Sequence, residues 1–279
     1  MSSNAMSLKA KIKNLAKKKD MSAQVVLQNY MFERFLERIS KSEYKNKLIL
    51  KGGMLIAAIV GIDNRATMDM DATLKGYPLN EESLLKAIND ICSVNVGDDV
   101  VFSFIKVEPI REDDDYGGYR ASIQSVFDTI ITPMQIDITT GDAITPREIL
   151  YSFKMIFDDN TIDIWAYNIE TVLAEKYETI LRRGEFNTRP RDFYDIYILS
   201  KTQDFNKDLF SQAVLETSKH RGTTHIFEDI QKRISVIENS RELKNQWGKY
   251  KKNYSYAKNI SFEDIACVLK ELLISIKKG

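Results

Sequence analysis

The sequence is poor in the residues that build disulfide frameworks, zinc sites and histidine-dependent active sites. Among 279 residues it has two cysteines, Cys92 and Cys267, and two histidines, His220 and His225. The cysteines are far apart and lack the spacing of metal ligands, which argues against a disulfide framework or a zinc site and suits a reducing cytoplasm. We expect the histidines to be surface or capping residues. Carboxylates must therefore carry the chemistry of any active site.

Net charge and long hydrophobic runs are also absent. Forty basic residues balance forty acidic ones, which argues against a protein that coats nucleic acid but permits a local basic surface. The longest apolar stretch, Leu55 to Ile62, is interrupted by Gly61 and is far shorter than the ~20 residues that span a membrane. Because no secretory signal is visible either, we expect a cytoplasmic protein with no membrane partner.

The first 21 residues are expected to be a tag remnant and a lysine-rich lead-in. Ser-Asn-Ala-Met, ending at Met6, has the composition of a vector scar before a native start. From Lys9 to Lys19 lysines are dense. We interpret them as a solvated helix face or a mobile terminus rather than as an RNA contact, because charge runs are usually solvated.

Hydrophobic periodicity predicts an α+β fold, with a mixed-sheet N-terminal domain over residues 22–155 and a helical C-terminal domain over residues 156–279. Strands are expected up to about Leu150 and helices after it. An acidic connection, Arg111 to Gly118, is expected to be solvated and not to form the active site. The predicted helices cover residues 22–39, 54–60, 81–92, 169–184, 192–201, 207–220, 226–237 and 262–276, and the predicted strands cover residues 48–50, 69–71, 100–107, 119–127 and 134–139.

The most informative segment combines two glycines with two aspartates. Gly52 and Gly53 separate a strand from a helix, so the backbone can approach a phosphate closely while the helix directs its first N–H groups at it. Asp69 and Asp71 follow on a short strand, where residues two apart point to the same face. Two carboxylates this close repel each other unless a cation neutralises them, and hard oxygen ligands favour Mg²⁺.

Asp137 supplies a third carboxylate. Strand alternation places it on the face opposite its apolar neighbours. If its strand lies beside the strand of Asp69 and Asp71, the three carboxylates converge and can hold two Mg²⁺ ions, with Mn²⁺ as a possible substitute. One ion would activate an attacking hydroxyl and the other would bind a nucleotide triphosphate. Any one of these aspartates alone would be interpreted as an unrelated surface residue.

Four motifs occur in a fixed order between about Lys47 and Leu199. They are Lys51-Gly52-Gly53 with Arg65-Ala66-Thr67-Met68-Asp69-Met70-Asp71, then Ile136-Asp137-Ile138, then Thr171-Val172-Leu173-Ala174-Glu175-Lys176, and finally Arg189-Pro190-Arg191-Asp192-Phe193-Tyr194-Asp195. Together they resemble the motifs of the AbiEii/AbiGii toxin family of nucleotidyltransferases, which belongs to the polymerase β-like superfamily. One departure is Met54, which stands where the family usually has Thr or Ser and so removes a hydroxyl near the triphosphate.

The resemblance implies a role for each motif residue. It implies catalytic and metal-binding roles for Asp69, Asp71 and Asp137, and a catalytic role for Lys176, whose charge can also meet a triphosphate. Asp192 and Asp195 lie three residues apart on one helical face and could orient Lys176 or an arginine rather than bind metal. The resemblance implies nucleotide binding by Gly52, Gly53, Arg65, Thr67, Lys176, Arg191 and Asp192.

The function implied is a Mg²⁺-dependent toxin of a toxin–antitoxin or abortive-infection system. It would move a nucleoside monophosphate from an NTP to an RNA hydroxyl, at a tRNA 3′ end, and would have a cognate antitoxin. A nucleotide-binding regulatory protein without turnover and a protein-nucleotidylating enzyme are the alternatives. The stretch from Trp247 to Tyr256 mixes lysines with aromatics; we interpret it as a packed helix end rather than a base-stacking surface.

Overall fold

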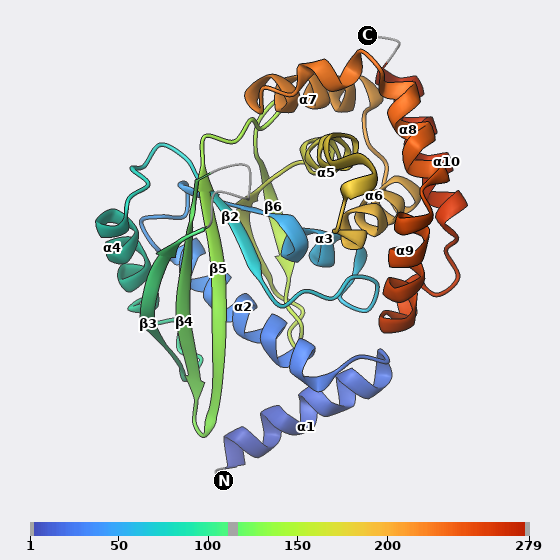
Figure 1. The fold of residues 1–279 in the computed structure, drawn as a ribbon. Coiled ribbons are helices and arrows are strands. Elements are labelled where there is room, and N and C mark those ends of the chain that lie inside the picture. The colour runs from blue at the N-terminus through green and yellow to red at the C-terminus, as the bar shows by residue number, and fades with distance from the viewer. Residues whose placement is uncertain (1–2, 111–116, 277–279) are drawn as a thin grey trace. The chain divides into compact units, whose positions relative to one another are not determined.

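The structure, a computed structural model, describes residues 3–110 and 117–276 and divides into two compact units (Figure 1). The first unit contains Met1–Gly141 and Ile149–Ala166, and the second contains Asp142–Glu148 and Tyr167–Gly279. The sheet belongs to the first unit, and the second is built from helices. The prediction of a mixed sheet followed by helices is therefore confirmed. Most of the acidic connection, residues 111–116, lies outside the described residues.

The first unit is built on a mixed seven-stranded sheet. Its strand order is β3-β4-β5-β2-β1-β7-β6. β2 pairs with β5 and β1 pairs with β7 in parallel, whereas the other neighbours are antiparallel. The strands are β1 (Leu48–Lys51), β2 (Met70–Leu74), β3 (Val100–Pro109), β4 (Tyr119–Phe127), β5 (Ile130–Thr140), β6 (Ile149–Lys154) and β7 (Thr161–Ala166).

Four helices accompany this sheet: α1 (Ser3–Lys18), α2 (Ala23–Lys41), α3 (Gly52–Val60) and α4 (Glu81–Cys92). α2 begins where Ser22 accepts a hydrogen bond from the Val25 N–H, which satisfies one of the free donors of the first turn. Its apolar stripe, including Phe32 and Phe35, is fully buried. Burial of each such side chain contributes about 1.5–3 kcal/mol, so packing holds α2 in place.

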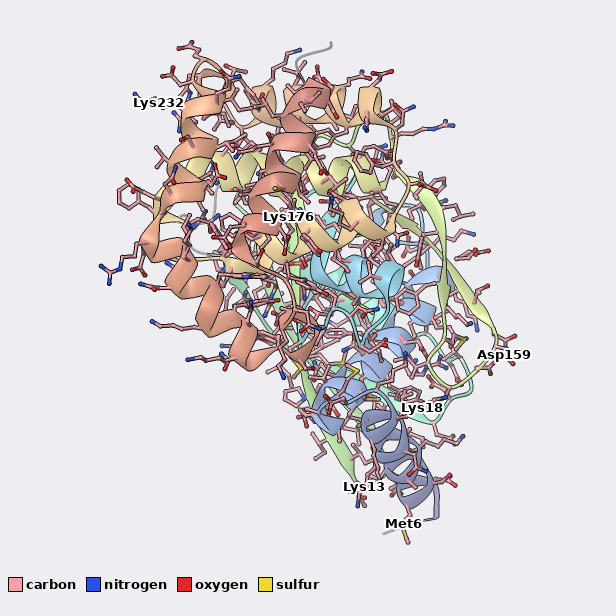
Figure 2. All side chains as sticks on the ribbon, turned by 90° about the vertical axis from the view of Figure 1, so that its right-hand side faces the viewer. Met6, Lys13, Lys18, Asp159, Lys176 and Lys232 are labelled. Carbon is pink, nitrogen blue, oxygen red and sulfur yellow. The ribbon has the colours of Figure 1, made fainter. Side chains whose placement is uncertain are left out.

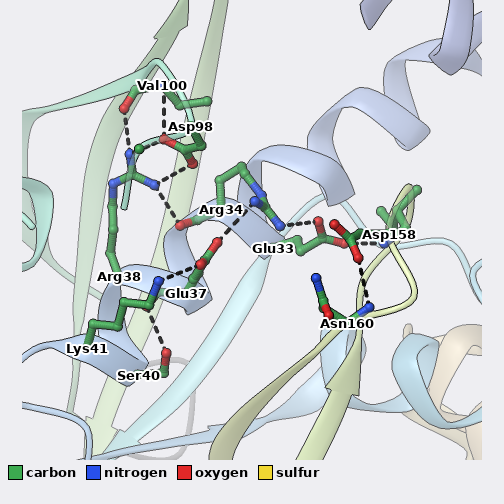
Figure 3. A network of polar contacts seen from close by, with 12 residues as sticks. Glu33, Arg34, Glu37, Arg38, Ser40, Lys41, Asp98, Val100, Asp158 and Asn160 are labelled. Atoms are coloured by element: carbon green, nitrogen blue, oxygen red, sulfur yellow. Dashed lines mark hydrogen bonds and ion pairs between the residues drawn. The ribbon is translucent and has the colours of Figure 1, made fainter. Parts of the chain in front are cut away.

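A polar network on α2 fixes the helix to the ends of the sheet (Figure 3). Arg38 donates to both carboxylate oxygens of Asp98, at 2.9 and 2.7 Å, and to the Val100 carbonyl. One turn earlier, Arg34 lies between Glu33 and Glu37. Glu33 in turn accepts a hydrogen bond from the Ile156 N–H, in the turn between β6 and β7. These buried ion pairs position α2 rather than add much net stability.

Two sequence expectations for the first unit are corrected. Strands do not end near Leu150, because β6 and β7 form a hairpin at the edge of the sheet. In β7, buried Ile162 and Ile164 alternate with exposed neighbours, which is the period of a half-buried strand. Asp69 lies one residue before β2 rather than within it.

The second unit contains the remaining helices. Asn168 caps the first of them by accepting from the Thr171 N–H at 2.8 Å, and Gly184 is its C-cap as predicted. Pro190 stands in the first turn of the next, also as predicted. The helices are α5 (Ile169–Arg183), α6 (Pro190–Thr202), α7 (Lys207–His220), α8 (Ile230–Asn239), α9 (Arg241–Asn253) and α10 (Phe262–Ile276), with short 3₁₀ turns at Gly184–Phe186, Thr224–Phe227 and Ser255–Ala257.

The sequence prediction gives no range for helix α9, but it interprets residues 247–256 as a packed helix end, and the packing of α9 agrees with this. Trp247 is buried, and its indole N–H donates to the Ile260 carbonyl at 3.0 Å. The neighbouring lysines, such as Lys252, are exposed. Within residues 3–110 and 117–276, no helix is both long and apolar enough to cross a membrane.

Candidate active site

The glycine turn at the start of α3 is packed directly against Asp71. Gly52 has φ +64, and a Cβ added there would lie 2.0 Å from Asp71 Oδ2. The Gly53 N–H donates to that same oxygen at 3.3 Å. Both the backbone angle and the close approach therefore require glycine. The glycine turn and the Asp71 carboxylate are therefore in direct contact, which the spacing in the sequence alone could not show.

Gly53 makes a second close approach, to the loop that leads into β2. A Cβ on Gly53 would lie 2.9 Å from Thr67 Oγ1 and 3.1 Å from Arg65 Nη2. Arg65 and Thr67 are themselves only 1% and 3% exposed. Thr67 Oγ1 donates to the Asp69 carbonyl at 3.1 Å, and Asn29 on α2 donates to the Thr67 carbonyl at 3.0 Å. These contacts set the path of the chain into Asp69.

Met54, the departure from the family pattern, is buried in α3 with 1% of its surface exposed. Its side chain therefore belongs to the core of the first unit. A hydroxyl is missing at this position, so the backbone N–H groups at Gly52 and Gly53 are the polar groups that the turn offers.

Asp71 and Asp137 are brought side by side by the parallel pairing of β2 with β5. They are register partners in that ladder, so the condition set by the sequence, that the two strands lie side by side, is met. Both side chains are partly exposed. Lys51 on β1 is the register partner of Asp71 on its other side, and its ammonium group donates to Thr139 Oγ1 at 2.7 Å. A cation thus lies beside the carboxylates.

Asp137 is held by an arginine that the sequence prediction missed. Arg120 on β4 is its register partner across the antiparallel pair β4 and β5. Its Nε donates to Oδ1 and its Nη2 to Oδ2, each at 2.7 Å. A bidentate pair of this kind is stronger and more directional than a single ion pair. The signal was present in the sequence only as an isolated arginine on a strand, and the register was needed to interpret it.

The donor chemistry at Asp69, Asp71 and Asp137 fits a divalent metal, because all three are hard oxygen ligands. As the side chains stand, however, the described residues contain no group of three or more His, Cys, Asp and Glu side chains gathered closely enough to hold a metal ion. Asp137 is instead neutralised by Arg120. Full coordination by the three carboxylates therefore requires Asp137 to leave or to share that arginine.

Lys176, which is labelled in Figure 2, is the centre of a second charged cluster, in the helical unit. It projects from α5 and forms ion pairs with Asp192 and, at 3.3 Å, with Asp195 on α6. Both carboxylates are buried, whereas 18% of the Lys176 side chain is exposed. Asp192 also lies 3.4 Å from Arg189, so the two aspartates contact both Lys176 and an arginine, the two partners that the sequence left open. The ammonium group is thereby fixed at the surface of the unit.

The arginines of the fourth motif differ in their surroundings. Arg189 lies 3.4 Å from Asp192 Oδ2 through its Nε, and half of its side chain is exposed. Arg191 is partly exposed at the start of α6. His220 and His225 are exposed, as expected, and no role in chemistry is assigned to them.

Comparison with known proteins gives a consistent result. A family model described as the nucleotidyl transferase AbiEii toxin of a type IV toxin–antitoxin system matches residues 34–266. A crystal structure of a candidate nucleotidyltransferase from H. pylori is 16% identical with a TM-score of 0.51, covering 92% of this chain and 97% of that one. JHP933 from Helicobacter pylori is 15% identical with a TM-score of 0.50, covering 92% and 95%. No curated protein matches the chain.

Proposed function

Because the chain belongs to the AbiEii family of nucleotidyl transferase toxins of type IV toxin–antitoxin systems, we propose that it transfers a nucleoside monophosphate from an NTP to a hydroxyl of RNA and releases pyrophosphate. The tRNA 3′ end is the proposed acceptor. Membership in a type IV system implies a cognate antitoxin. The substrate nucleotide, the acceptor and the role of each site residue are the parts of this proposal that go beyond family membership.

The first unit supplies the groups that hold the reacting phosphate. Asp69 and Asp71 would bind Mg²⁺ or Mn²⁺, joined by Asp137 once Arg120 releases it. A divalent metal in such a site activates an attacking hydroxyl and stabilises charge on the leaving oxygen. Phosphate oxygens would bind at the start of α3, as they do at helix N-termini, where the Gly53 N–H would be shared with Asp71.

Lys176 would act on the leaving group. Its ammonium is positioned by Asp192 and Asp195, so little orientational freedom has to be lost when it meets a triphosphate. A fixed cation of this kind stabilises the charge that develops on pyrophosphate. Arg191, at the exposed start of the same helix α6, is proposed to contact nucleotide, and buried Arg65 and Thr67 are proposed to support the nucleotide site from behind.

The observation that carries the proposal is the contact between Gly52 and Asp71. A left-handed glycine whose missing Cβ would overlap a carboxylate oxygen has no evident purpose in a surface turn. Such a contact does serve a purpose where a phosphate-binding backbone and a metal-binding carboxylate must lie within reach of the same phosphate.

A transfer assay tests the proposal. The protein is incubated with each α-labelled NTP, Mg²⁺ and total tRNA, in parallel with tRNA whose 3′ end has been oxidised by periodate. We expect label on intact tRNA with at least one NTP, no label on oxidised tRNA, and loss of label in Asp69→Ala. The exposed Asp159→Ala is the matched control. Label that is undiminished in Asp69→Ala would reject the proposal.

One observation favours a second candidate, a nucleotide-binding regulatory protein without turnover. The pair between Arg120 and Asp137 neutralises the carboxylate that turnover needs. Calorimetry separates the two functions: NTP·Mg²⁺ binding without release of pyrophosphate, in the presence of RNA, favours the binding protein. Nucleotidylation of a protein acceptor would appear as a mass adduct on a partner or on the chain itself.

A further inference from the structure

The first helix carries a uniformly basic outer surface. No acidic residue occurs before Asp20, whereas α1 carries lysines at positions 9, 11, 13, 17 and 18. All five are exposed. Lys9, Lys13 and Lys17 follow one another at intervals of four residues, which places them along one side of the helix. Like charges at this spacing repel each other by a few tenths of a kcal/mol per pair, so helix stability does not explain them.

The helix is anchored through its other side. Ala5, Leu8, Ile12 and Ala16 are buried, and α1 packs against α2. The apolar side of α1 is therefore buried against the rest of the protein. An amphipathic helix that binds a membrane must keep that stripe available for the lipid, so α1 does not have the design of a membrane anchor. Its lysines are fixed on a folded element, with Lys13 and Lys18 labelled in Figure 2.

The exposed side of α1 also lacks the features of a protein-binding surface. Met6 at its start is exposed, but between Ser7 and Lys18 the helix presents lysines and small or polar residues, such as Asn14, and no exposed large apolar side chain. The centres of protein–protein interfaces are enriched in aromatic residues, Met and Arg and depleted in Lys. A row of lysines without an apolar anchor is suited instead to a phosphate backbone.

The position of α1 connects this surface to the proposed active site within the same unit. Lys19, just after the helix, forms an ion pair with Asp63 at 2.8 Å. Asp63 lies in the loop that runs from α3 through Thr67 to Asp69. The C-terminal end of α1 therefore adjoins the loop that leads to Asp69.

The basic helix α9 is a weaker candidate for the same role. Lys244 is paired with Glu263, and its aromatic neighbours Trp247 and Tyr250 are buried. Its charge is partly neutralised and its rings are not available to stack on bases.

We propose that Lys9, Lys13 and Lys17 of α1 form the surface on which the acceptor RNA docks through its phosphate backbone. This inference rests on the proposed function for the identity of the acceptor. The contacts are to phosphates and carry no sequence information. They raise the affinity for RNA and its dependence on salt, and leave the choice of NTP to the active site.

Fluorescence anisotropy with labelled tRNA, in the absence of NTP, tests the surface directly. The triple variant Lys9→Glu/Lys13→Glu/Lys17→Glu is compared with Lys45→Glu/Lys207→Glu/Lys232→Glu, which changes three exposed lysines elsewhere. Both triple variants have the same net charge, so a general effect of charge cancels. Replacement of the α1 lysines by glutamine provides a second version that avoids new negative charge, and circular dichroism checks that each variant folds.

We expect the α1 variant to bind tRNA about tenfold more weakly, and the slope of log K against log salt to fall by about two units, since each lost contact removes about 0.7. The control variant should bind almost as the parent does. Equal weakening in the two variants, or none in either, would overturn the inference. So would lysine-dependent binding to anionic vesicles or to polyglutamate in place of tRNA. Because this binding assay contains no NTP, its result does not depend on whether the protein transfers nucleotide. Failure of RNA to dock on α1 would likewise leave the proposed nucleotidyl transfer to be tested by its own assay.

Discussion

Arg120 and Asp137 face each other across β4 and β5 and are joined by two hydrogen bonds of 2.7 Å. Under the proposed function a metal ion binds Asp137, and the arginine and the metal would then compete for one carboxylate. Metal binding would have to work against this pair. Arg120 is in this sense a positioning residue, which holds the Asp137 carboxylate through both of its oxygens.

Replacing Arg120 by Gln should tighten the binding of Mn²⁺ to the protein without nucleotide by about fivefold, which corresponds to the loss of one partly exposed ion pair of about 1 kcal/mol. Calorimetry or electron paramagnetic resonance of Mn²⁺ measures this without any turnover. Lys106→Gln is the control, because Lys106 pairs with Glu108 on the neighbouring strand β3 and both are exposed. Unchanged or weaker Mn²⁺ binding in Arg120→Gln would show that the arginine does not compete with metal.

Gly52→Ala should abolish transfer by displacing Asp71. The added Cβ would lie 2.0 Å from Asp71 Oδ2, and a misplacement of about 1 Å at a reacting group can cost about 100-fold in rate. Gly76→Ala is a close control, because Gly76 has φ +63 but nothing within 4 Å of its added Cβ. Both variants should lose about 1 kcal/mol of stability through backbone strain. Equal loss of transfer in the two would mean that strain, and not contact with Asp71, is responsible.

Lys176→Met should reduce both transfer and stability. Removing the ammonium leaves the buried carboxylates of Asp192 and Asp195 without their shared cation, and breaking a buried pair costs about 3–5 kcal/mol. Urea denaturation measures the loss. The double variant Lys176→Met/Asp192→Asn should recover part of the stability but none of the transfer. The control is Lys201→Met, whose pair with Glu271 is exposed and should matter by less than about 1 kcal/mol.

The network in Figure 3 predicts two opposite dependences of stability on pH. Burial by itself raises the pKa of Asp98, but hydrogen bonds and the charge of Arg38 outweigh burial and leave that pKa lowered. Asp98 therefore contributes stability that is present above its unfolded pKa and is lost as pH falls through the lowered folded pKa. Burial raises the pKa of Glu33, against the opposing charge of Arg34. The stability that Glu33 contributes is fully present below the pKa of this residue in the unfolded chain. It is lost as the pH rises through the higher pKa of Glu33 in the folded protein.

Unfolding in urea at a series of pH values tests both signs. Asp98→Asn should flatten the loss of stability in acid below pH ~4, the ordinary range of an aspartate. Glu33→Gln should instead remove the decline in stability just above pH ~4.3, where an ordinary glutamate titrates. If both variants flattened the same side of the profile, the opposite assignments of the two pKa shifts would be wrong.

The sequence predicted those elements whose pattern is local. The helix that contains Phe32 and Phe35 shows a 3.6-residue period. Gly184 at a helix end and Pro190 in a first turn are residue types that mark helix boundaries by themselves. The strand 161–166 was missed although it alternates, because it follows a hairpin edge strand with little burial. Short edge strands carry too few buried residues to give a clear period.

Long-range geometry accounts for what the sequence could not provide at the site. The motifs identified Asp71 and Asp137, but their side-by-side register depends on the parallel pairing of β2 with β5. The role of Arg120 depends on a second ladder, between β4 and β5. No local pattern marks an arginine that will face a particular aspartate, because strand register is set by the whole sheet. The overlap of Gly52 with Asp71 is likewise visible only in three dimensions.

The central claim is that the carboxylates beside the glycine turn support transfer of a nucleoside monophosphate to RNA. The most direct measurement is the intact mass of purified tRNA after incubation with protein, Mg²⁺ and all four NTPs, with pyrophosphate quantified in the same reaction. We predict a gain of one or more nucleotide masses matched by an equal amount of pyrophosphate, absent in Asp69→Ala and Asp71→Ala and kept in Asp159→Ala. Unchanged tRNA mass with the parent protein, or the same gain in Asp71→Ala, would contradict the claim.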